Sequence, residues 1–571
     1  MRTVEETASL IFEKDVEIGM RDGISLRANI YRPLAPGQYP VVLAMGVYGK
    51  DVHFRDGFKP QWEKLTQIYP GIDKDGSTGR FLRWETADPE RWVPDGYVLI
   101  SVDSRGSGKS PGYLDPYSPT ETMDHYEAIE WAGVQEWSNG KVGLLGISYF
   151  AIRQWLVASL QPPHLAAIVP WEGASDSLRE WGRHGGIMSN AFPSAWLPRQ
   201  VLVNQNGNEN SPQRDPDTGE RTTGPVVDEN LLAGNIADHI SDLRRHDLAD
   251  EWHRERSADF SRINVPLFSA GNLGGPGLHL RGNIEGYMGA ASSDKWLQLH
   301  VGTHYESFYL PEYVALQKRF FDKYLKGLDN GFEAEPPVRV AIRRADGATV
   351  HGETAWPLAG TVWSDHYLDA SNKSLGPVAA AEAGSVEFEA TGAGVTFKTA
   401  PFTTESEFTG PIVLKLFASS STADMDIFAT LRLFAADGTE VRFTGAHEEV
   451  PVTRGWLRAS HRQLDPQRST HWRPVLSHKK KQPIVPSEIY ELDIEIWPTS
   501  IVCEKGQVLA LTIMGNDFQY ETPGRIVHND PEDRGSDTFQ GTTTIYSGSN
   551  YPSKIILPFI PANRQDRSKI G

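Results

Sequence analysis

Cysteine is almost absent from this chain of 571 residues, since Cys503 is the only one. A single cysteine cannot form an intrachain disulfide, and it rules out a metal site built from cysteine pairs. We therefore expect no metal, and a fold that is stabilised by its core rather than by covalent cross-links.

Long apolar runs and an excess of basic residues are also missing. No stretch reaches the length of a membrane span, and the N-terminal residues lack a basic region followed by an apolar core. We expect no signal peptide, no membrane partner and a cytoplasmic location. The net charge of -18, with no basic stripe, argues against a nucleic-acid partner. At this length the chain is expected to form two to four domains.

The most informative stretch is KVGLLGISYFAIRQWLVASL, residues 141–160. An apolar run ends at Ser148 and is followed by apolar residues at helical spacing, which predicts a buried strand that turns sharply into a helix. A serine at such a turn is a candidate nucleophile, although a serine can also simply cap a helix. The pattern G-x-S-x-G is only partly met, because Gly146 fits but the fifth position is Phe150, and the next small residue is Ala151.

Strands and helices alternate along the first half of the chain. Such alternation predicts a mainly parallel sheet with helices on both faces, after an N-terminal hairpin. Ligands of these sheets bind at the carboxyl ends of the strands, where Tyr48, Ser148 and Glu172 all fall. The strands are expected within 40–49, 98–102, 142–147, 165–173, 265–272 and 295–304, the helices within 122–136, 278–288 and 311–328, and the hairpin within 14–33.

The remaining segments have different patterns. Residues 51–90 show no sustained period and are expected to cross the surface. Residues 177–262 have patchy helical signals and predict an inserted helical cap. After residue 333, alternating apolar runs separated by turns predict a β-sandwich or jelly roll. Four tryptophans of residues 51–90 and 177–262 could line an acyl pocket or belong to the core: Trp62, Trp84, Trp181 and Trp196.

The glycine-rich loop after the second buried strand contains Gly108-Lys109-Ser110, part of a phosphate-binding pattern. That pattern requires a glycine five residues before Gly108, where this chain has Asp103. We therefore expect a tight turn held by Asp103 and Arg105, and no nucleotide.

Five motifs together resemble the CocE/NonD family of α/β-hydrolases, the group of cocaine esterase and X-prolyl dipeptidyl-peptidase. The resemblance covers nearly the whole chain and includes the family's own form of the serine turn, in which Ala151 takes the position of the small residue. The motifs are RDGISLRANIYRP (21–33), PDGYVLISVDSRGSGKSPG (94–112), GISYFAIRQW (146–155), HVGTH (300–304) and PPVRVAIR (336–343).

The resemblance implies an α/β-hydrolase domain with an inserted helical cap and a C-terminal jelly-roll domain. We expect the catalytic domain over 1–176 and 263–333, the cap over 177–262 and the jelly roll over 334–571. The implied activity is hydrolysis of a small-molecule ester or amide through an acyl-enzyme, without a cofactor.

Several site residues follow from the resemblance. Ser148 is the expected nucleophile, and His304 is the expected base, in the order along the chain that this fold uses. The backbone N–H of Tyr149 and the hydroxyl of Tyr48 are the expected oxyanion donors. His300 and His304 have a spacing that would suit a metal on a helix, but this segment is expected to be a strand.

The triad acid departs from the family. Relatives have an aspartate just after the strand that matches 265–270, whereas this chain reads GNLGGPG at 271–277. We therefore predict Glu172, at the end of the preceding strand, as the acid of a Ser148–Glu172–His304 triad. Asp176 is the reserve candidate, but it is more simply explained as a helix cap or as a partner of Arg179.

Two other functions stay open. An X-prolyl dipeptidyl peptidase would need carboxylates to bind the α-amino group of the substrate, and the cap has many acidic residues. A catalytically inactive hydrolase could instead act as a binding protein through its β domain. The identity of the acyl and leaving groups does not follow from the sequence, and a homo-oligomer is possible.

Overall fold

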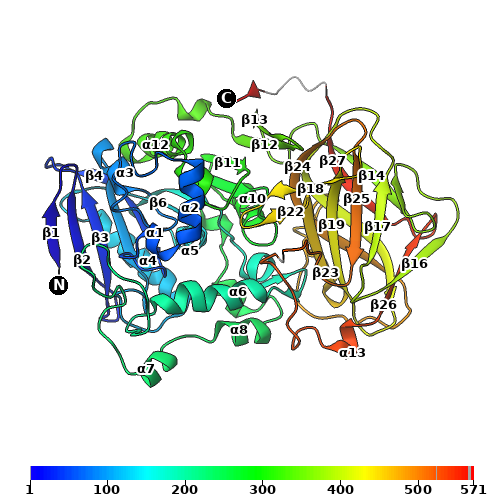
Figure 1. The fold of residues 1–571 in the computed structure, drawn as a ribbon, viewed down its shortest axis with the longest axis horizontal. Helices are drawn as coiled ribbons and strands as arrows, with labels where there is room; N and C mark the ends of the chain where they lie inside the picture. Colours follow the sequence, from blue (N-terminus) through cyan, green and yellow to red (C-terminus); the bar gives the residue numbers. More distant parts are fainter. Residues whose placement is uncertain (1, 523, 563–567, 571) are drawn as a thin grey trace.

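The structure is a computed structural model that describes residues 2–522, 524–562 and 568–570. Figure 1 shows two lobes side by side, an N-terminal lobe of helices around a sheet and a C-terminal lobe made almost entirely of strands. Among the described residues, no helix combines the length and the apolar character needed to cross a membrane.

The N-terminal lobe is built on a sheet with the strand order β1-β2-β3-β5-β4-β6-β7-β10-β11-β12. The pairs from β5 to β12 are parallel, which confirms the predicted parallel sheet, and β2 and β3 form the predicted hairpin. The strands are β1 (Thr3–Glu6), β2 (Ile11–Gly19), β3 (Ser25–Arg32), β4 (Tyr39–Gly46), β5 (Val98–Asp103), β6 (Ser138–Ile147), β7 (Leu165–Trp171), β10 (Leu267–Asn272), β11 (Lys295–His300) and β12 (Val338–Arg344).

Both faces of this sheet are covered, because its strands carry apolar residues at successive positions. In β4, Val41 and Leu43 pack in one core cluster with Ile129 of α4, while Val42 packs in another with Phe320 of α12. Alternate side chains of a strand point to opposite faces, so these helices lie on opposite sides. The main helices are α4 (Pro119–Gly133), α5 (Tyr149–Ala158), α10 (Leu280–Gly289), α11 (Glu306–Tyr309) and α12 (Pro311–Lys326).

The expectation that residues 51–90 cross the surface is wrong. This segment forms α1 (Phe54–Gly57), α2 (Lys59–Ile68) and the start of α3 (Pro89–Trp92), and most of its aromatic side chains are buried. The ring of Phe58 stacks on that of Trp84 at 4.4 Å, and Phe54 packs against Trp84 at 4.9 Å. The physical reason is hydrophobic, since so many aromatic rings are more stable when they pack together than in water.

Residues 177–262 contain short helices rather than long ones. Three of them begin after an aspartate whose side chain accepts a backbone N–H of the first turn: Asp228, Asp238 and Asp250. The elements here are β8 (Arg183–His184), β9 (Ile187–Met188), α6 (Ala191–Trp196), α7 (Glu229–Gly234), α8 (His239–Arg245) and α9 (Glu251–Glu255), with π-helical turns at Ser177–Gly182 and Leu197–Val201.

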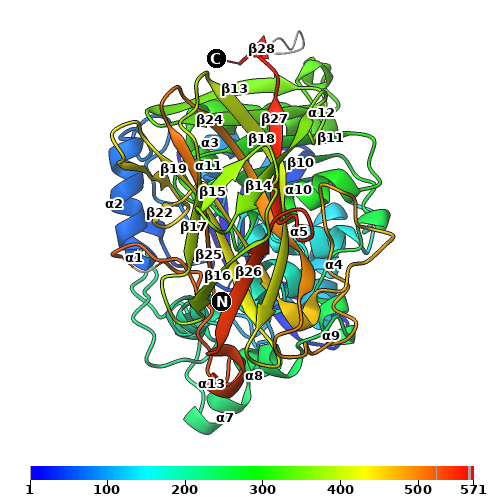
Figure 2. The ribbon, with the colours of Figure 1, turned by 90° about the vertical axis from the view of Figure 1, so that its right-hand side faces the viewer.

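The C-terminal lobe surrounds a second core of aliphatic side chains. Its two longest strands, β18 and β24, pair antiparallel along most of their length. Figure 2 looks onto this lobe. Its strands are β13 (Gly347–Glu353), β14 (Val362–Asp369), β15 (Ser374–Gly376), β16 (Gly384–Glu389), β17 (Val395–Thr399), β18 (Ser406–Ser420), β19 (Asp426–Phe434), β20 (Glu440–Val441), β21 (Phe443–Thr444), β22 (Glu449–Val450), β23 (Thr453–Arg458), β24 (Tyr490–Cys503), β25 (Val508–Met514), β26 (Thr542–Ser547), β27 (Lys554–Ile560) and β28 (Ser568–Lys569), with one short helix, α13 (Ser536–Phe539).

The two lobes share hydrogen-bonded strands. β12 pairs parallel with β11 of the first lobe through Val338 and Leu297, and its other end meets β24 of the second lobe through Arg343 and Ile501. The sheet of the first lobe therefore continues directly into the second.

The glycine-rich loop after β5 is held by Asp103, as predicted. The Asp103 carboxylate accepts the backbone N–H groups of Lys50 at 2.6 Å and of Lys109 at 2.9 Å. A Cβ at Gly108 would lie 2.2 Å from this carboxylate, so only glycine fits there.

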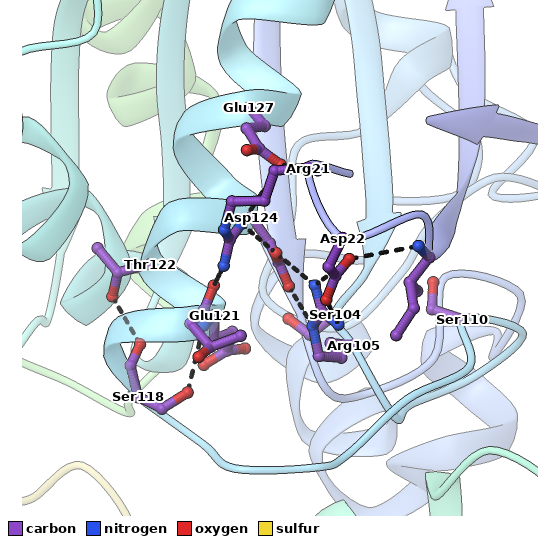
Figure 3. Close-up of polar contacts among 12 residues, drawn as sticks. Arg21, Asp22, Ser104, Arg105, Ser110, Ser118, Glu121, Thr122, Asp124 and Glu127 are labelled. Carbon is purple, nitrogen blue, oxygen red and sulfur yellow. Dashed lines mark hydrogen bonds and ion pairs between the residues drawn. The ribbon is translucent and has the colours of Figure 1, made fainter. Parts of the chain in front are cut away.

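Arg105 secures the same loop from the other side. Figure 3 shows its guanidinium between Asp22 and Asp124, and the closest N–O distance to each carboxylate is 2.7 Å. The Arg21 side chain reaches Asp124 as well, at 2.8 Å. These ion pairs give the loop the structural role that the sequence predicted for it.

Candidate active site

Ser148 lies at the turn between β6 and α5, where the predicted strand and helix meet. Its backbone has φ 56° and ψ -112°, a conformation that residues other than glycine rarely adopt. The turn is held by the Ser148 N–H, which donates to the carbonyls of Trp171 at 3.0 Å and Glu172 at 3.1 Å. A strained serine between strand and helix has the geometry of a nucleophile elbow.

Small residues around this turn let the chain segments approach closely. A Cβ at Gly173 would lie 2.7 Å from Cβ of Ala151, and a Cβ at Gly146 would lie 2.5 Å from Cβ of Phe150. A larger residue at 151 would therefore collide with the chain after β7. The position that must be small is Ala151 and not Phe150, as the family pattern implied.

His304 and Glu172 meet at the carboxyl edge of the sheet. Nδ1 of His304 lies 2.6 Å from Oε2 of Glu172, and both residues are buried. The other Glu172 oxygen accepts a hydrogen bond from Asn272 at 3.2 Å and lies 3.5 Å from Nε2 of His300. Burial alone would lower the pKa of His304, but the carboxylates of Glu172 and Glu85 outweigh it and raise that pKa to about 10.

The hydroxyl of Ser148 contacts a different histidine. Oγ lies 3.1 Å from Nε2 of His279, whose Nδ1 accepts the backbone N–H of Ala174 at 3.2 Å. Because Nδ1 is an acceptor, the proton of this neutral ring is on Nε2, which donates to Oγ. Burial, followed by the charge of His304, lowers the pKa of His279 well below its ordinary value.

The His279 ring stacks on that of His304, with centroids 5.4 Å apart and planes inclined by 14°. No hydrogen bond joins Ser148 to His304 within the described part of the chain. His279 therefore contacts Ser148 directly, whereas His304 stacks on His279. Nε2 of His304 has a different partner.

That partner is Glu85, a residue that the sequence did not single out. Its Oε1 lies 3.1 Å from Nε2 of His304, and among the described residues its Oε2 has no hydrogen-bond partner. Burial raises the pKa of Glu85 to about 7, against the lowering effect of His304. His304 therefore lies between two carboxylates, and one of them takes up a proton near neutral pH.

The two predicted oxyanion donors are the backbone N–H of Tyr149 and the hydroxyl of Tyr48. The N–H of Tyr149 is the first of α5, and the first N–H groups of a helix have no acceptor within it. The hydroxyl of Tyr48 accepts a hydrogen bond from Nε1 of Trp196 at 3.1 Å. Burial raises the pKa of Tyr48 well above its ordinary value, so the hydroxyl keeps its proton as a donor.

The position of α5 is fixed by contacts with Glu121. The side-chain hydroxyl of Tyr149 donates to this buried carboxylate at 2.7 Å, and Arg153 forms an ion pair with it. Glu121 belongs to α4, beside the ion pairs of Figure 3. The helix that presents the Tyr149 N–H is thus anchored by charge as well as by packing.

Asp176 has the structural role that the sequence favoured. Its carboxylate accepts the N–H groups of Leu178 at 3.1 Å and Arg179 at 3.0 Å, and it pairs with the Arg179 guanidinium at 2.7 Å. The described structure gives it no contact with His304.

A mainly parallel sheet with a serine elbow and a carboxylate–histidine pair at its carboxyl edge defines an α/β-hydrolase. Residues 22–306 match the X-Pro dipeptidyl-peptidase (S15 family), and residues 330–556 match its C-terminal non-catalytic domain. A CocE/NonD family hydrolase from Staphylococcus aureus is 33% identical, with a TM-score of 0.84 and coverage of 98% of this chain and 96% of its own.

Two further relatives extend the comparison. Cocaine esterase of Rhodococcus sp. is 25% identical over 96% of this chain and 98% of its own. An aminopeptidase from the marine sediment archaeon Thaumarchaeota archaeon shares the fold, with 17% identity, a TM-score of 0.66 and coverage of 98% and 96%. The chain belongs to the CocE/NonD family of hydrolases. It is a serine hydrolase, which cleaves a carboxylic ester or amide through an acyl-enzyme.

Three groups at the site were missed in the sequence. His279 precedes α10, Glu85 belongs to the segment assigned to the surface, and His447 comes from the C-terminal lobe, with its ring 5.1 Å from that of His304. The density of aromatic residues in 51–90 was the one signal that could have placed Glu85 in a core. No local sequence pattern points to His279 or His447 as residues of the site.

Proposed function

We propose that Ser148, His304 and Glu172 form the catalytic triad of an esterase or amidase that acts on small molecules. The observation that carries this proposal is the elbow serine beside the buried Glu172–His304 pair, at one edge of the sheet. The backbone N–H of Ser148 donates a hydrogen bond to the carbonyl of Glu172, so the same turn holds the proposed nucleophile and the proposed acid.

Proton movement follows from the partners of His304. Nε2 must lose its proton before it can accept that of Ser148, and the Glu85 carboxyl group, 3.1 Å away, is the acceptor in place. Because the pKa of His304 is about 10 and that of Glu85 about 7, the ring is mostly protonated at neutral pH, and activity should rise towards alkaline pH. The Ser148 hydroxyl must then turn from Nε2 of His279 to Nε2 of His304, which takes its proton while Oγ bonds to the substrate carbonyl carbon. The protonated ring next gives that proton to the leaving group as the acyl-enzyme forms, and a water molecule repeats the sequence in reverse.

The negative oxygen of each tetrahedral intermediate is stabilised by the Tyr149 N–H and the Tyr48 hydroxyl. Both are donors that the fold places in advance, so little reorganisation is needed when charge develops. His279, a neutral donor to Oγ, holds the serine side chain in place between turnovers.

The finer architecture belongs to the same proposal. We divide the chain into a catalytic domain (1–176 and 263–333), a cap (177–262) and a β domain of the jelly-roll type (334–571). The pairing of long antiparallel strands around an aliphatic core supports the last assignment. We also propose a cytoplasmic location.

A direct test combines labelling and substitution. A fluorophosphonate probe is expected to label the native protein at Ser148, and Ser148→Ala is expected to lose both the label and at least 10⁵-fold in kcat while staying folded. Ser159→Ala, at the far end of α5, removes another buried hydroxyl and serves as the matched control. A folded native protein that takes no label would instead support the inactive, binding-protein alternative.

The X-prolyl dipeptidyl peptidase alternative has less support at the site. A substrate α-amino group needs free carboxylates, but Glu180 of the cap is bound by Arg281 at 3.0 Å, and Asp176 is bound by Arg179. We expect para-nitrophenyl esters to be hydrolysed much faster than alanyl-prolyl para-nitroanilide. The reverse order would favour the peptidase.

A further inference from the structure

A cleft of about 500 Å³ is lined by Trp196 and Phe58, which both contact Tyr48, the proposed oxyanion donor. Three distant parts of the chain line it: the start of α2 with Phe58, the cap segment from Phe192 to Gln200, and the loop of the C-terminal lobe with Gly524 and Arg525. The cleft therefore lies where the α1–α2 segment, the cap and the β lobe meet.

The deep wall of this cleft is shared with the active site. Trp196 lines the cleft and donates its Nε1–H to the Tyr48 hydroxyl, and the ring of Phe58 packs edge-on against Tyr48 at 5.9 Å. On the other side, Phe192 stacks on His447 at 6.5 Å, and His447 lies against His304. A substrate at Ser148 would thus extend a part of itself into this space.

The charge of the cleft has one sign. Arg199 and Arg525 are the charged residues among those that line it, and the remaining lining is apolar or uncharged. Within the described ranges, neither guanidinium is paired with a carboxylate. The nearby Glu448 accepts the backbone N–H of Arg525 at 3.0 Å and so caps the loop instead of neutralising the side chain.

The positive charge of Arg525 also acts on His447, the ring beside His304. Burial lowers the pKa of His447 well below its ordinary value, and the charges of His304 and Arg525 lower it further. Two uncompensated guanidinium groups at one cleft stand out in a chain whose net charge is -18. The protein as a whole carries a negative charge that repels anions, but the two arginines make the cleft locally attractive to them.

We propose that this cleft binds an anionic group of the substrate, so that the preferred substrates are esters or amides that carry a carboxylate. This inference rests on the proposed function, since it names the substrate class of the same site. Guanidinium groups suit a carboxylate because they can donate two parallel N–H bonds, and the apolar walls suit the hydrocarbon part. A cationic substituent would meet two like charges and would be disfavoured.

The test compares matched pairs of esters. On the acyl side, mono-para-nitrophenyl glutarate is compared with para-nitrophenyl pentanoate. On the leaving-group side, para-acetoxybenzoate is compared with its methyl ester. We expect the native enzyme to favour the anionic member of at least one pair by about tenfold or more in kcat/KM, and this ratio to fall as salt screens the exposed arginines.

Substitutions then locate the effect. In the double variant Arg199→Gln/Arg525→Gln the ratio is expected to fall to about one, whereas Arg199→Lys/Arg525→Lys keeps part of it. Arg55→Gln, which removes an exposed arginine outside the cleft lining, should leave the ratio unchanged. Labelling of each variant by the fluorophosphonate probe shows that its site is folded.

The outcomes separate this inference from the proposed function. If neutral esters are turned over but neither pair shows an anionic preference, or the double variant keeps the preference, the anionic cleft is ruled out while the esterase stands. If no ester is turned over and Ser148 takes no label, the proposed function itself fails, and this inference fails with it.

Discussion

The residues of the site come from two kinds of place, and the two differ in how they are held. Tyr48, Ser148, Glu172 and His304 all follow the carboxyl ends of parallel strands, so the register of the sheet sets their positions. A second set, Glu85, His279, His447 and the cleft residues, comes from loops, the cap and the other lobe. Strand ends thus hold the residues of the proposed triad and the proposed Tyr48 donor, and loops hold the groups that surround them.

The two carboxylates on His304 show this difference most clearly. Each oxygen of Glu172, which follows β7, has a nitrogen of a neighbouring side chain beside it. Glu85 comes from a loop, has one oxygen without a partner among the described residues, and has a pKa raised by burial to about 7. The two carboxyl groups on one ring thus differ in their environments: Glu172 is hydrogen-bonded at both oxygens, whereas burial favours the protonated form of Glu85.

The largest effect in this comparison is expected at Glu172. Glu172→Gln keeps the volume but removes the charge that orients His304 and stabilises its protonated form, so kcat should fall by roughly 10³–10⁴. Asp176→Asn is the matched control and should retain most activity, because Asp176 caps a helix. Steady-state kinetics that give the opposite order would move the acid to Asp176, and two active variants would leave His304 without an identified acid.

A smaller effect is expected at Tyr48. Tyr48→Phe removes one oxyanion donor and little volume, so kcat should fall on the order of 10²–10³ with a smaller change in KM. Tyr31→Phe removes a buried hydroxyl that has no partner in the described structure and should leave kcat unchanged. An unaltered kcat for Tyr48→Phe, with chemistry rate-limiting, would exclude Tyr48 as a donor.

The smallest change in maximal rate is expected at Glu85, where the effect is on pH dependence. Glu85 helps to raise the pKa of His304 to about 10, so Glu85→Gln should lower that pKa. The acid limb of kcat/KM, where activity rises as His304 loses its proton, should therefore move to lower pH by about one unit or more. Profiles from acid to alkaline pH measure this shift, and a limb that stays in place would show that Glu85 does not act on His304.

The same division explains what the sequence could predict. The parallel sheet, the hairpin and the turn at Ser148 follow from local patterns of apolar residues, and strand ends then bring Tyr48, Ser148 and Glu172 to one edge. The segment 51–90 was misassigned because its burial depends on aromatic contacts between residues far apart, such as Trp84 and Tyr305 at 5.5 Å, rather than on a period. The place of His279 depends on packing within the first lobe and that of His447 on packing between the lobes, and neither leaves a local trace in the sequence.

Because β12 is shared between the lobes, it limits how the two lobes can move relative to each other. Two domains that are joined by a flexible linker can swing apart to admit a substrate. Here hydrogen bonds of β12 to both β11 and β24 leave no hinge at that seam, so the angle between the lobes is fixed. Access of a substrate to Ser148 must then depend on movements of side chains and loops at the entrance. On heating, the two lobes should unfold together in one cooperative transition.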